Sequence, residues 1–285
     1  MKNKVLTGLL LVLIGGWGNL LAQNAGSNYA RQVNTLIGTK GVGLTSGYLY
    51  PGATYPYGMV QFTPSYFSKR SGFVINQLSG GGCEHMGNFP TFPVKGKLKM
   101  SPDNILNYRI NISEEKGHAG YYEAMVQEDI KAKLTVTERT GMASYEYPAD
   151  QQYGTVIIGG GISATPIEQA AIVITAPNKC EGYAEGGNFC GLRTPYKVYF
   201  VAEFDADALE SGTWKRDELK PNTTFAEGEY SGVYFTFDVS KKKNVQYKIG
   251  VSYVSVENAR ENLKAENTGW DFLQIQNQAE SKWNH

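Results

Sequence analysis

The fold of this 285-residue chain is decided by a stretch between residues 33 and 96. Its two most informative segments are Tyr50-Pro-Gly-Ala-Thr-Tyr-Pro-Tyr-Gly-Met-Val-Gln-Phe-Thr-Pro64 and Gln77-Leu-Ser-Gly-Gly-Gly-Cys-Glu-His-Met-Gly-Asn-Phe-Pro90. Proline fixes φ and glycine tolerates positive φ, so this density of both residues excludes a helix and predicts tight turns. The run Gly80-Gly-Gly82 fits either backbone that a ligand approaches closely or a softened hairpin tip, and the run alone does not decide between them.

The segments around this stretch predict an antiparallel β-sandwich. Runs that alternate apolar and polar residues, or that are rich in β-branched and aromatic residues, follow one another with turn residues between them. They cover residues 94–100, 108–112, 121–126, 132–137, 142–147, 155–159, 171–175, 196–204, 233–239 and 247–256. No helical pattern of any length appears before about residue 257, which argues against a parallel α/β sheet. We therefore predict an all-β domain over residues 23–256.

The last thirty residues change to helical character. Residues 257–266 are rich in helix formers, and Thr268-x-x-Asp271 is a capping-box variant that opens a second helix. The apolar face of this second helix consists of Phe272, Ile275, Ala279 and Trp283. Neither Gly nor Pro ends the helix. We interpret residues 257–285 as a truncated helical linker and expect its apolar face to lack the domain that would cover it.

The first 22 residues have the pattern of a secretory signal peptide. A basic start, Met1-Lys-Asn-Lys4, precedes an apolar run that ends at Leu21, and Ala22 offers a small residue for cleavage. The competing interpretation is a membrane anchor, but the uninterrupted apolar part, Leu9 to Ile14, is far shorter than the roughly 20 residues of a spanning helix. We expect a periplasmic or secreted protein with no membrane span after cleavage.

The charge balance argues against a nucleic-acid partner. The chain has 27 Lys and Arg against 27 Asp and Glu, and removal of the leader takes away two lysines, so the mature formal charge is near −2. Binding to phosphates requires a basic excess or stripe, which this composition lacks. The one basic cluster, Lys241-Lys-Lys243, lies between two strand-like runs, and we interpret it as a solvated turn rather than a phosphate or surface site.

The three cysteines pose a pairing question in an oxidising compartment. Cys180 and Cys190 flank a short glycine-containing segment that reads as a flexible loop, and we predict a disulfide between them. Cys83 would then be left over, as a plain buried residue or as a contact to a ligand. A metal site is disfavoured, because the cysteines lack zinc spacing and His85 and His118 have no partner at ligand spacing.

Six motifs follow one another along the chain after its leader. They are Val33-Asn-Thr-Leu-Ile-Gly-Thr39, Pro51-Gly-Ala53, Pro56-Tyr-Gly-Met-Val-Gln61, Leu78-Ser-Gly-Gly-Gly-Cys83, Phe189-Cys190 and Tyr196-Lys-Val-Tyr-Phe-Val-Ala-Glu-Phe204. Together, and in this order, they resemble the N-terminal domain of family 92 glycoside hydrolases. Members of that family are secreted or periplasmic, calcium-dependent exo-α-mannosidases that act on N-glycans and mannans.

The resemblance implies both a fold and a missing part. It implies a large sandwich of the galactose-mutarotase-like, or supersandwich, type, followed in the family by a larger (α/α)6 domain that supplies the catalytic acid and base. This chain stops before that domain, so we expect a truncated N-terminal domain that carries no catalytic residue and is inactive by itself. The resemblance also implies calcium in the complete enzyme, with no calcium ligand assignable in this chain.

Two departures from the family pattern limit what the resemblance implies. Many members read Gly-Phe-Ser-His-x-His where this chain reads Gly72-Phe-Val-Ile-Asn-Gln77, so no role of those histidines carries over. The segment Glu84-His-Met-Gly-Asn-Phe-Pro90 also differs from the commoner Asp-Tyr-Gly-Asp pattern. The chain therefore resembles a divergent subgroup, and the preferred sugar linkage stays open.

We expect the domain to contribute recognition of mannose-containing glycans. Exposed backbone and polar side chains near the glycine run would bond to hydroxyl groups, and Tyr57 or Phe89 would stack on a sugar ring. The candidate residues are Gly38, Thr39, Tyr57, Gly81, Gly82, Glu84, His85 and Asn88. Glu203, Asp205 and Asp207 fit solvated acids at a strand end better than the catalytic carboxyl pair of a glycosidase. The alternative function is a stand-alone carbohydrate-binding or scaffold domain.

Overall fold

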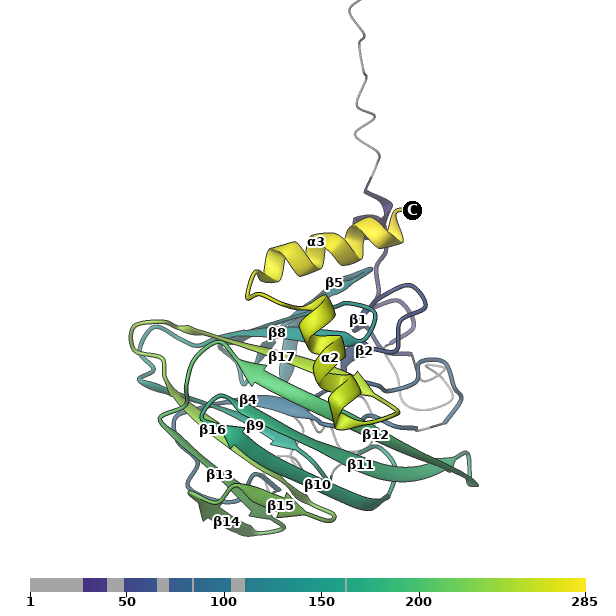
Figure 1. Ribbon diagram of the computed structural model, residues 1–285. Coiled ribbons are helices and arrows are strands. Elements are labelled where there is room, and N and C mark those ends of the chain that lie inside the picture. The colour runs from purple at the N-terminus through teal and green to yellow at the C-terminus, as the bar shows by residue number, and fades with distance from the viewer. Residues whose placement is uncertain (1–27, 40–48, 66–71, 84, 104–110, 162) are drawn as a thin grey trace, which may run out of the picture.

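A computed structural model describes residues 28–39, 49–65, 72–83, 85–103, 111–161 and 163–285 of the chain (Figure 1). The expected signal peptide, the candidate residue Glu84 and most of the strand expected over residues 108–112 lie outside these ranges.

Two antiparallel sheets form the body of the molecule (Figure 1). The first has eight strands in the order β1 (Ala53–Thr54), β2 (Gln61–Pro64), β3 (Phe73–Val74), β4 (Thr91–Lys95), β9 (Tyr153–Gly159), β16 (Ser231–Asp238), β13 (Glu210–Lys215) and β14 (Glu218–Pro221). The second has nine strands in the order β15 (Phe225–Glu227), β10 (Ile167–Ala176), β11 (Lys179–Phe189), β12 (Leu192–Phe204), β17 (Asn244–Ser252), β8 (Thr140–Glu146), β7 (Ile130–Val136), β6 (Tyr121–Val126) and β5 (Ile112–His118). The predicted all-β sandwich is confirmed.

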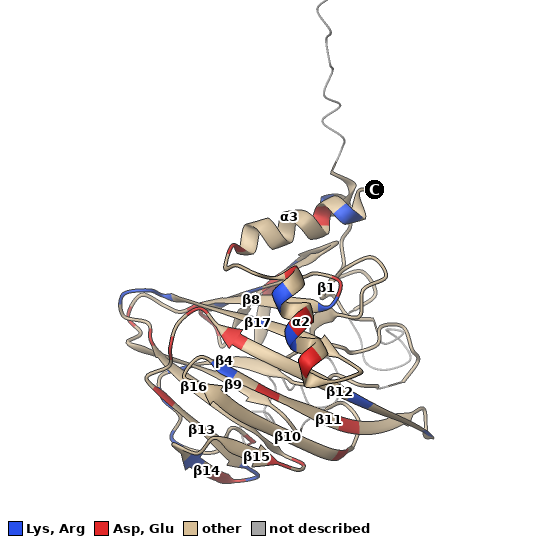
Figure 2. Cartoon of the chain, in the orientation of Figure 1, with Lys and Arg blue, Asp and Glu red and all other residues tan. Residues whose placement is uncertain are grey.

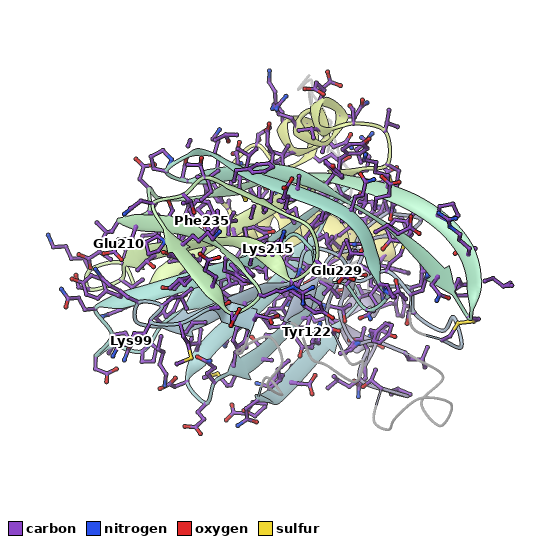
Figure 3. The ribbon with its side chains drawn as sticks, turned by 90° about the horizontal axis from the view of Figure 1, so that it is seen from below. Lys99, Tyr122, Glu210, Lys215, Glu229 and Phe235 are labelled. Atoms are coloured by element: carbon purple, nitrogen blue, oxygen red, sulfur yellow. A yellow bond between two sulfur atoms is a disulfide. The ribbon has the colours of Figure 1, made fainter. Side chains whose placement is uncertain are left out.

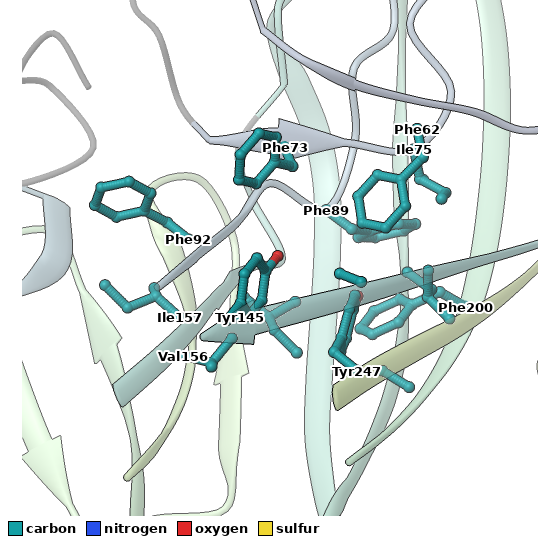
Figure 4. Close-up of a cluster of buried hydrophobic side chains, with 14 of the residues drawn as sticks. Phe62, Phe73, Ile75, Phe89, Phe92, Tyr145, Val156, Ile157, Phe200 and Tyr247 are labelled. Carbon is teal, nitrogen blue, oxygen red and sulfur yellow. The ribbon is translucent and has the colours of Figure 1, made fainter. Parts of the chain in front are cut away.

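The core lies between the two sheets and is rich in aromatic rings (Figure 4). Phe62 and Phe73 come from the first sheet, and Tyr145 and Tyr247 come from the second; all four side chains are fully buried. The rings of Phe73 and Tyr145 stack with centroids 6.2 Å apart, an arrangement that adds to the burial of apolar area. The facing aromatic sides of the sheets therefore hold the sandwich together.

The sequence patterns missed β1 to β3, most of β5, β11 and β13 to β15, and the strand expected over residues 94–100 instead ends at Lys95 as part of β4. The reason is clearest in β11, which contains Gly182, Gly186 and Gly187 and therefore resembles a loop. A side chain at Gly182 would approach the carbonyl oxygen of Ala171 on β10 to 2.1 Å. This glycine is thus required by close packing inside the sheet and does not mark a turn.

The helices whose bounds are described are the 3₁₀ helix η1 (Tyr29–Gln32), α2 (Val256–Glu266) and α3 (Phe272–Trp283). The Ser255 side chain caps α2 by accepting from the Asn258 backbone N–H at 3.1 Å. The second helix begins three residues later than expected, because Asp271 and not Thr268 is its N-cap. The two helical segments predicted at the C-terminal end are confirmed, with this shift.

The expectation that the apolar face of α3 lacks a cover is wrong. Phe272 and Ile275 pack with Met142 of β8, and a side chain at Gly120 would approach the Cβ of Ala279 to 2.8 Å. The outer face of the nine-stranded sheet thus covers this helix (Figure 1). A helix stabilises a fold by burying its apolar stripe, and the sheet itself provides the surface here.

A polar clasp ties α3 to η1. The Glu280 carboxylate, nearly buried, accepts from Arg31 Nε at 2.8 Å and from Asn28 Nδ2 at 3.1 Å. The Asn284 side chain accepts from the Ala30 backbone N–H at 2.9 Å. The two ends of the described chain are therefore bound to each other beside the sandwich.

Candidate functional site

Two glycine-containing segments meet at one end of the sandwich. One is the connection between β3 and β4, residues 75–90, and the other is the tip of the β11–β12 hairpin, residues 187–194. A disulfide between Cys83 and Cys190 joins them, with Cα atoms 5.6 Å apart. Figure 3 shows this bond in yellow at the end of the long hairpin. We call the surface formed by Gly81, Gly82, His85 and Phe189 the loop–hairpin face.

The predicted disulfide between Cys180 and Cys190 is wrong. The residues between these cysteines form the extended strand β11 and not a flexible loop. Ten residues of strand at about 3.3 Å each separate the two by about 33 Å, far beyond the roughly 7 Å that a disulfide spans. Cys180 is instead a free thiol that points into the core, and burial raises its pKa.

His85 is packed under the hairpin tip. Its Nδ1 lies 3.4 Å from the backbone oxygen of Asn188, so Nδ1 donates and a neutral ring keeps Nε2 as an acceptor. The ring meets Phe189 edge-on at 4.8 Å and Tyr196 at 5.9 Å between centroids. His85 is 6 % exposed, which makes it a wall of the loop–hairpin face and not a projecting side chain.

Asn88 anchors a buried hydrogen-bond network beneath the same face. Its Oδ1 accepts from Asn76 Nδ2 at 3.0 Å and from the Tyr196 hydroxyl at 2.9 Å. The Asn76 Oδ1 in turn accepts from the backbone N–H groups of Gly87 and Asn88 at 3.2 and 2.8 Å. Burial raises the pKa of Tyr196, so the hydroxyl stays protonated as a donor. Asn88 therefore shapes the loop and does not itself present an accessible amide.

Some polar atoms in this layer have no hydrogen-bond partner among the described residues. They are both amide atoms of Gln77, Nδ2 of Asn88 and Oγ1 of Thr165. The Gln77 side chain is 1 % exposed, and its Nε2 lies 3.4 Å from the position that a Cβ on Gly87 would take. Buried polar groups normally find a partner, so buried water would stabilise this layer.

The other predicted residues fall into two groups. A Cβ added to Gly38 would lie 2.7 Å from the Leu49 side chain, and one added to Gly80 would lie 3.6 Å from it. The turn that contains Thr39 therefore lies beside the glycine run. Thr39 Oγ1 donates to the Leu36 carbonyl within its own turn, at 2.8 Å. Tyr57 lies on a separate turn between β1 and β2 and is fully exposed.

The aromatic residue of the face is Phe189 and not Phe89. Phe89 is 1 % exposed and packs on Phe200 in the core at 4.2 Å between ring centroids. The expected stacking role of Phe89 is therefore wrong. A Cβ added to Gly81 would lie 3.4 Å from the Phe189 ring. A Cβ added to Gly82 would have no atom within 4 Å. Phe189 was not predicted as a site residue. The only sequence feature that could have indicated it is the family motif Phe189-Cys190.

Glu203 near the end of β12 and Asp205 just after it are held in ion pairs. Glu203 contacts Lys179 Nζ at 2.9 Å and Lys248 Nζ at 3.5 Å, and Asp205 pairs with Lys242. Lys242 belongs to the basic cluster between β16 and β17, which is a turn as expected. In the view of Figure 2, basic and acidic residues are interspersed over the strands and helices. These acids thus have structural partners at the end of β12 remote from the hairpin tip.

The described residues assign no ligand to the calcium that the family resemblance implies for the complete enzyme. Within the described ranges, no group of three or more His, Cys, Asp or Glu side chains is placed to hold a metal ion. Calcium binds through six to eight oxygen ligands, commonly with carboxylates among them.

The sequence profile of the glycosyl hydrolase family 92 N-terminal domain matches residues 32–252. The chain belongs to this family. An uncharacterized secreted glycosidase of Arthroderma benhamiae is 26 % identical over 292 residues, a match that covers 89 % of this chain and 37 % of the relative. The family 92 chain thus spans little more than a third of this curated relative.

Solved structures of family 92 enzymes share the fold. The family 92 hydrolase ccman5 superposes with a TM-score of 0.78 at 22 % identity, over 90 % of this chain and 36 % of that one. The α-mannosidase BT3965 from Bacteroides thetaiotaomicron gives a TM-score of 0.75 at 25 % identity, over 88 % and 37 %. Within its described residues, this family 92 chain has no helix that is both long and apolar enough to cross a membrane.

Proposed function

We propose that this family 92 chain supplies the sugar-recognition wall of a secreted α-mannosidase-like glycoside hydrolase and binds mannose-containing glycans without carrying the catalytic acid and base. The observation that carries the proposal is the loop–hairpin face, in which a disulfide fixes two segments 107 residues apart in sequence. A fixed surface loses little conformational entropy when it binds a ligand.

The chemistry of the face suits a neutral, hydroxyl-rich ligand. Backbone groups of Gly81 and Gly82 offer donors and acceptors, and the Phe189 ring offers an apolar surface beside them. His85 Nε2 adds an acceptor when the ring is neutral. A terminal mannose would thus meet polar groups at its edge and an aromatic ring at its face.

An exposed apolar surface beside this face supports a partner domain. A cavity of about 230 Å³ is lined by residues 54–55, 58–61 and 76–78 together with Trp283. Of the side chains around it, Met59, Leu78 and Trp283 are each about two-fifths exposed, and Tyr57 on the neighbouring turn is fully exposed. Contiguous exposed apolar groups commonly mark protein interfaces. We assign this surface to the (α/α)6 domain that the family resemblance implies.

A second candidate function is a stand-alone carbohydrate-binding or scaffold domain. The observation that favours it is the covered face of α3, because the sandwich buries this helix without help from another domain. Both candidates predict sugar binding by the chain, and they differ in whether a helical domain adds to the affinity.

The test is a titration of the secreted chain with methyl α-mannoside, followed by NMR shifts of backbone amides. We expect shifts in residues 80–88 and 187–190, and weaker binding in Phe189→Ala. Phe225→Ala, at an exposed phenylalanine of β15 that pairs with Val173 near the other end of β11, should bind as the unaltered chain does. Absence of shifts in the loop–hairpin face at millimolar sugar would overturn the proposal, as would hydrolysis of mannosides by the purified chain.

A further inference from the structure

A second small cavity lies directly beside the loop–hairpin face. Its volume is about 240 Å³, and Pro166, Glu168, Gly187, Asn188, Gly191 and Arg193 line it. Asn188 is common to the cavity and the face, because its backbone oxygen contacts His85 Nδ1 at 3.4 Å. A ligand that touches His85 and Phe189 therefore has this cavity within reach of its next unit.

The side chains of the cavity are polar and their charges cancel. Arg193 Nη2 lies 3.4 Å from Glu168 Oε2, and both side chains keep a large exposed fraction, 76 % and 44 %. The guanidinium has further N–H donors and the carboxylate has further lone pairs, so neither group is saturated by this one contact. A vicinal pair of hydroxyl groups would donate to Glu168 and accept from Arg193. A phosphate or carboxylate ligand would meet the repulsion of Glu168.

The backbone around the cavity is fixed in shape. Asn188 Oδ1 accepts from the Gly191 N–H at 3.0 Å, and the intervening Cys190 is bound to Cys83. Gly187 has φ +146°, and a side chain there would approach the Thr194 carbonyl oxygen to 2.0 Å. Gly191, by contrast, has no atom within 4 Å of its Cβ position. Gly191 thus keeps open space beside the cavity, and a side chain would enter that space.

We propose that Glu168 and Arg193 form a second sugar subsite, which binds the next residue of a neutral mannose-containing glycan whose terminal mannose occupies the loop–hairpin face. This inference rests on the function proposed above. It assigns Glu168 as acceptor and Arg193 as donor to the hydroxyl groups of that second sugar, and neither is a catalytic residue.

The test compares a monosaccharide with disaccharides on the intact secreted chain. Methyl α-mannoside and the α-linked mannobioses are titrated separately and followed by backbone NMR shifts. At least one mannobiose should bind more tightly than the monosaccharide. Glu168→Ala and Arg193→Ala should each weaken that mannobiose about fivefold, the scale of a lost charge-assisted hydrogen bond at an exposed site, and leave the monosaccharide unchanged.

Two further variants control for fold and surface charge. Gly191→Asn fills the open space with a residue that tolerates positive φ, and it should weaken only the mannobiose. The ion pair between Arg260 of α2 and Glu181 of β11 is a more remote control, with 2.8 Å between Arg260 Nη2 and Glu181 Oε2. Six strand residues, about 20 Å, separate Glu181 from Gly187 of the cavity, so Arg260→Ala should change neither affinity.

The outcomes separate the two proposals. If mannobioses bind no more tightly than the monosaccharide, or if Arg193→Ala weakens both ligands equally, the subsite is overturned and the loop–hairpin face stands. If neither ligand binds, the proposed function is overturned, and the subsite proposal, which rests on it, is overturned as well.

Discussion

Single side chains at the loop–hairpin face show how a buried polar residue supports, from beneath, the surface that we propose binds sugar. Asn88 has an amide side chain that can donate and accept hydrogen bonds, and the sequence analysis predicted it as a sugar contact. In the structure it is fully buried, with its side chain bonded to Asn76 and Tyr196. Burial of an amide is set by the fold around it, and no local pattern in residues 84–90 reveals that.

Replacing Asn88 should therefore destabilise the fold. In Asn88→Ala the Asn76 amide and the Tyr196 hydroxyl lose an acceptor while remaining buried, which costs about 2 kcal/mol of unfolding free energy. Urea denaturation measures this loss. Asn277→Ala, at an exposed position in the middle of α3, should be neutral or slightly stabilising because alanine is the better helix former. Equal effects of the two substitutions would contradict the role given to Asn88.

The disulfide was predicted wrongly because the strand β11 was mistaken for a loop. The composition of residues 181–189 predicts a loop, because three of these nine residues are glycine. Those glycines instead allow close approach of neighbouring strands, as Gly182 does against Ala171. The run that predicts β6 is correct because its side chains alternate between the core and a more exposed face. β11 is a strand because of contacts with its neighbours across the sheet, which the local sequence does not reveal.

The disulfide between Cys83 and Cys190 should contribute substantially to stability. It closes a segment with a sequence separation of 107, for which chain entropy gives a stabilisation of about 3 to 5 kcal/mol. Peptide mass mapping under non-reducing conditions should link these two cysteines and find Cys180 alkylated only after unfolding. Cys83→Ser with Cys190→Ser should lower the unfolding free energy and weaken sugar binding. A peptide that links Cys180 to Cys190 would refute the assignment.

The clasp between α3 and η1 should make stability depend on acid pH. Burial by itself raises the pKa of Glu280, but the hydrogen bonds from Arg31, Gln276 and Asn28 outweigh it and leave that pKa below the ordinary value of 4.5. A lowered folded-state pKa stabilises the fold above the unfolded-state pKa, and this contribution is lost as pH falls through the folded value.

Unfolding midpoints of the unaltered chain and Glu280→Gln should therefore differ at pH 7 and converge below about pH 4. Glutamine keeps the shape of the side chain but loses the charge that Arg31 meets. The unfolding midpoint of Glu261→Gln, at an exposed position of α2, should change with pH as that of the unaltered chain does over the same range. A constant difference between Glu280→Gln and the unaltered chain down to pH 3 would contradict the clasp.

For the molecule as a whole, the sequence predicted the sandwich, the two helical segments and the family, but not where the last helix lies. The stripe of apolar residues on α3 was visible in the sequence. Its partner surface was not, because that surface depends on Gly120 and Met142, which are at least 130 residues away from α3 in the chain. Residues 257–285 thus pack as part of the sandwich unit.

Removal of residues 268–285 tests this assignment of α3. The deletion uncovers Met142 and Tyr121 and leaves Asn28 and Arg31 without Glu280, so we expect a lower melting temperature and binding of a hydrophobic dye. Ala279→Leu should have a smaller effect of the same sign, because the larger side chain would press against Gly120. Leu273→Ala, at an exposed position of the same helix, should change little. A truncated chain as stable as the full one would show that α3 is a linker, and the boundary at residue 256 would then be the true edge of the domain.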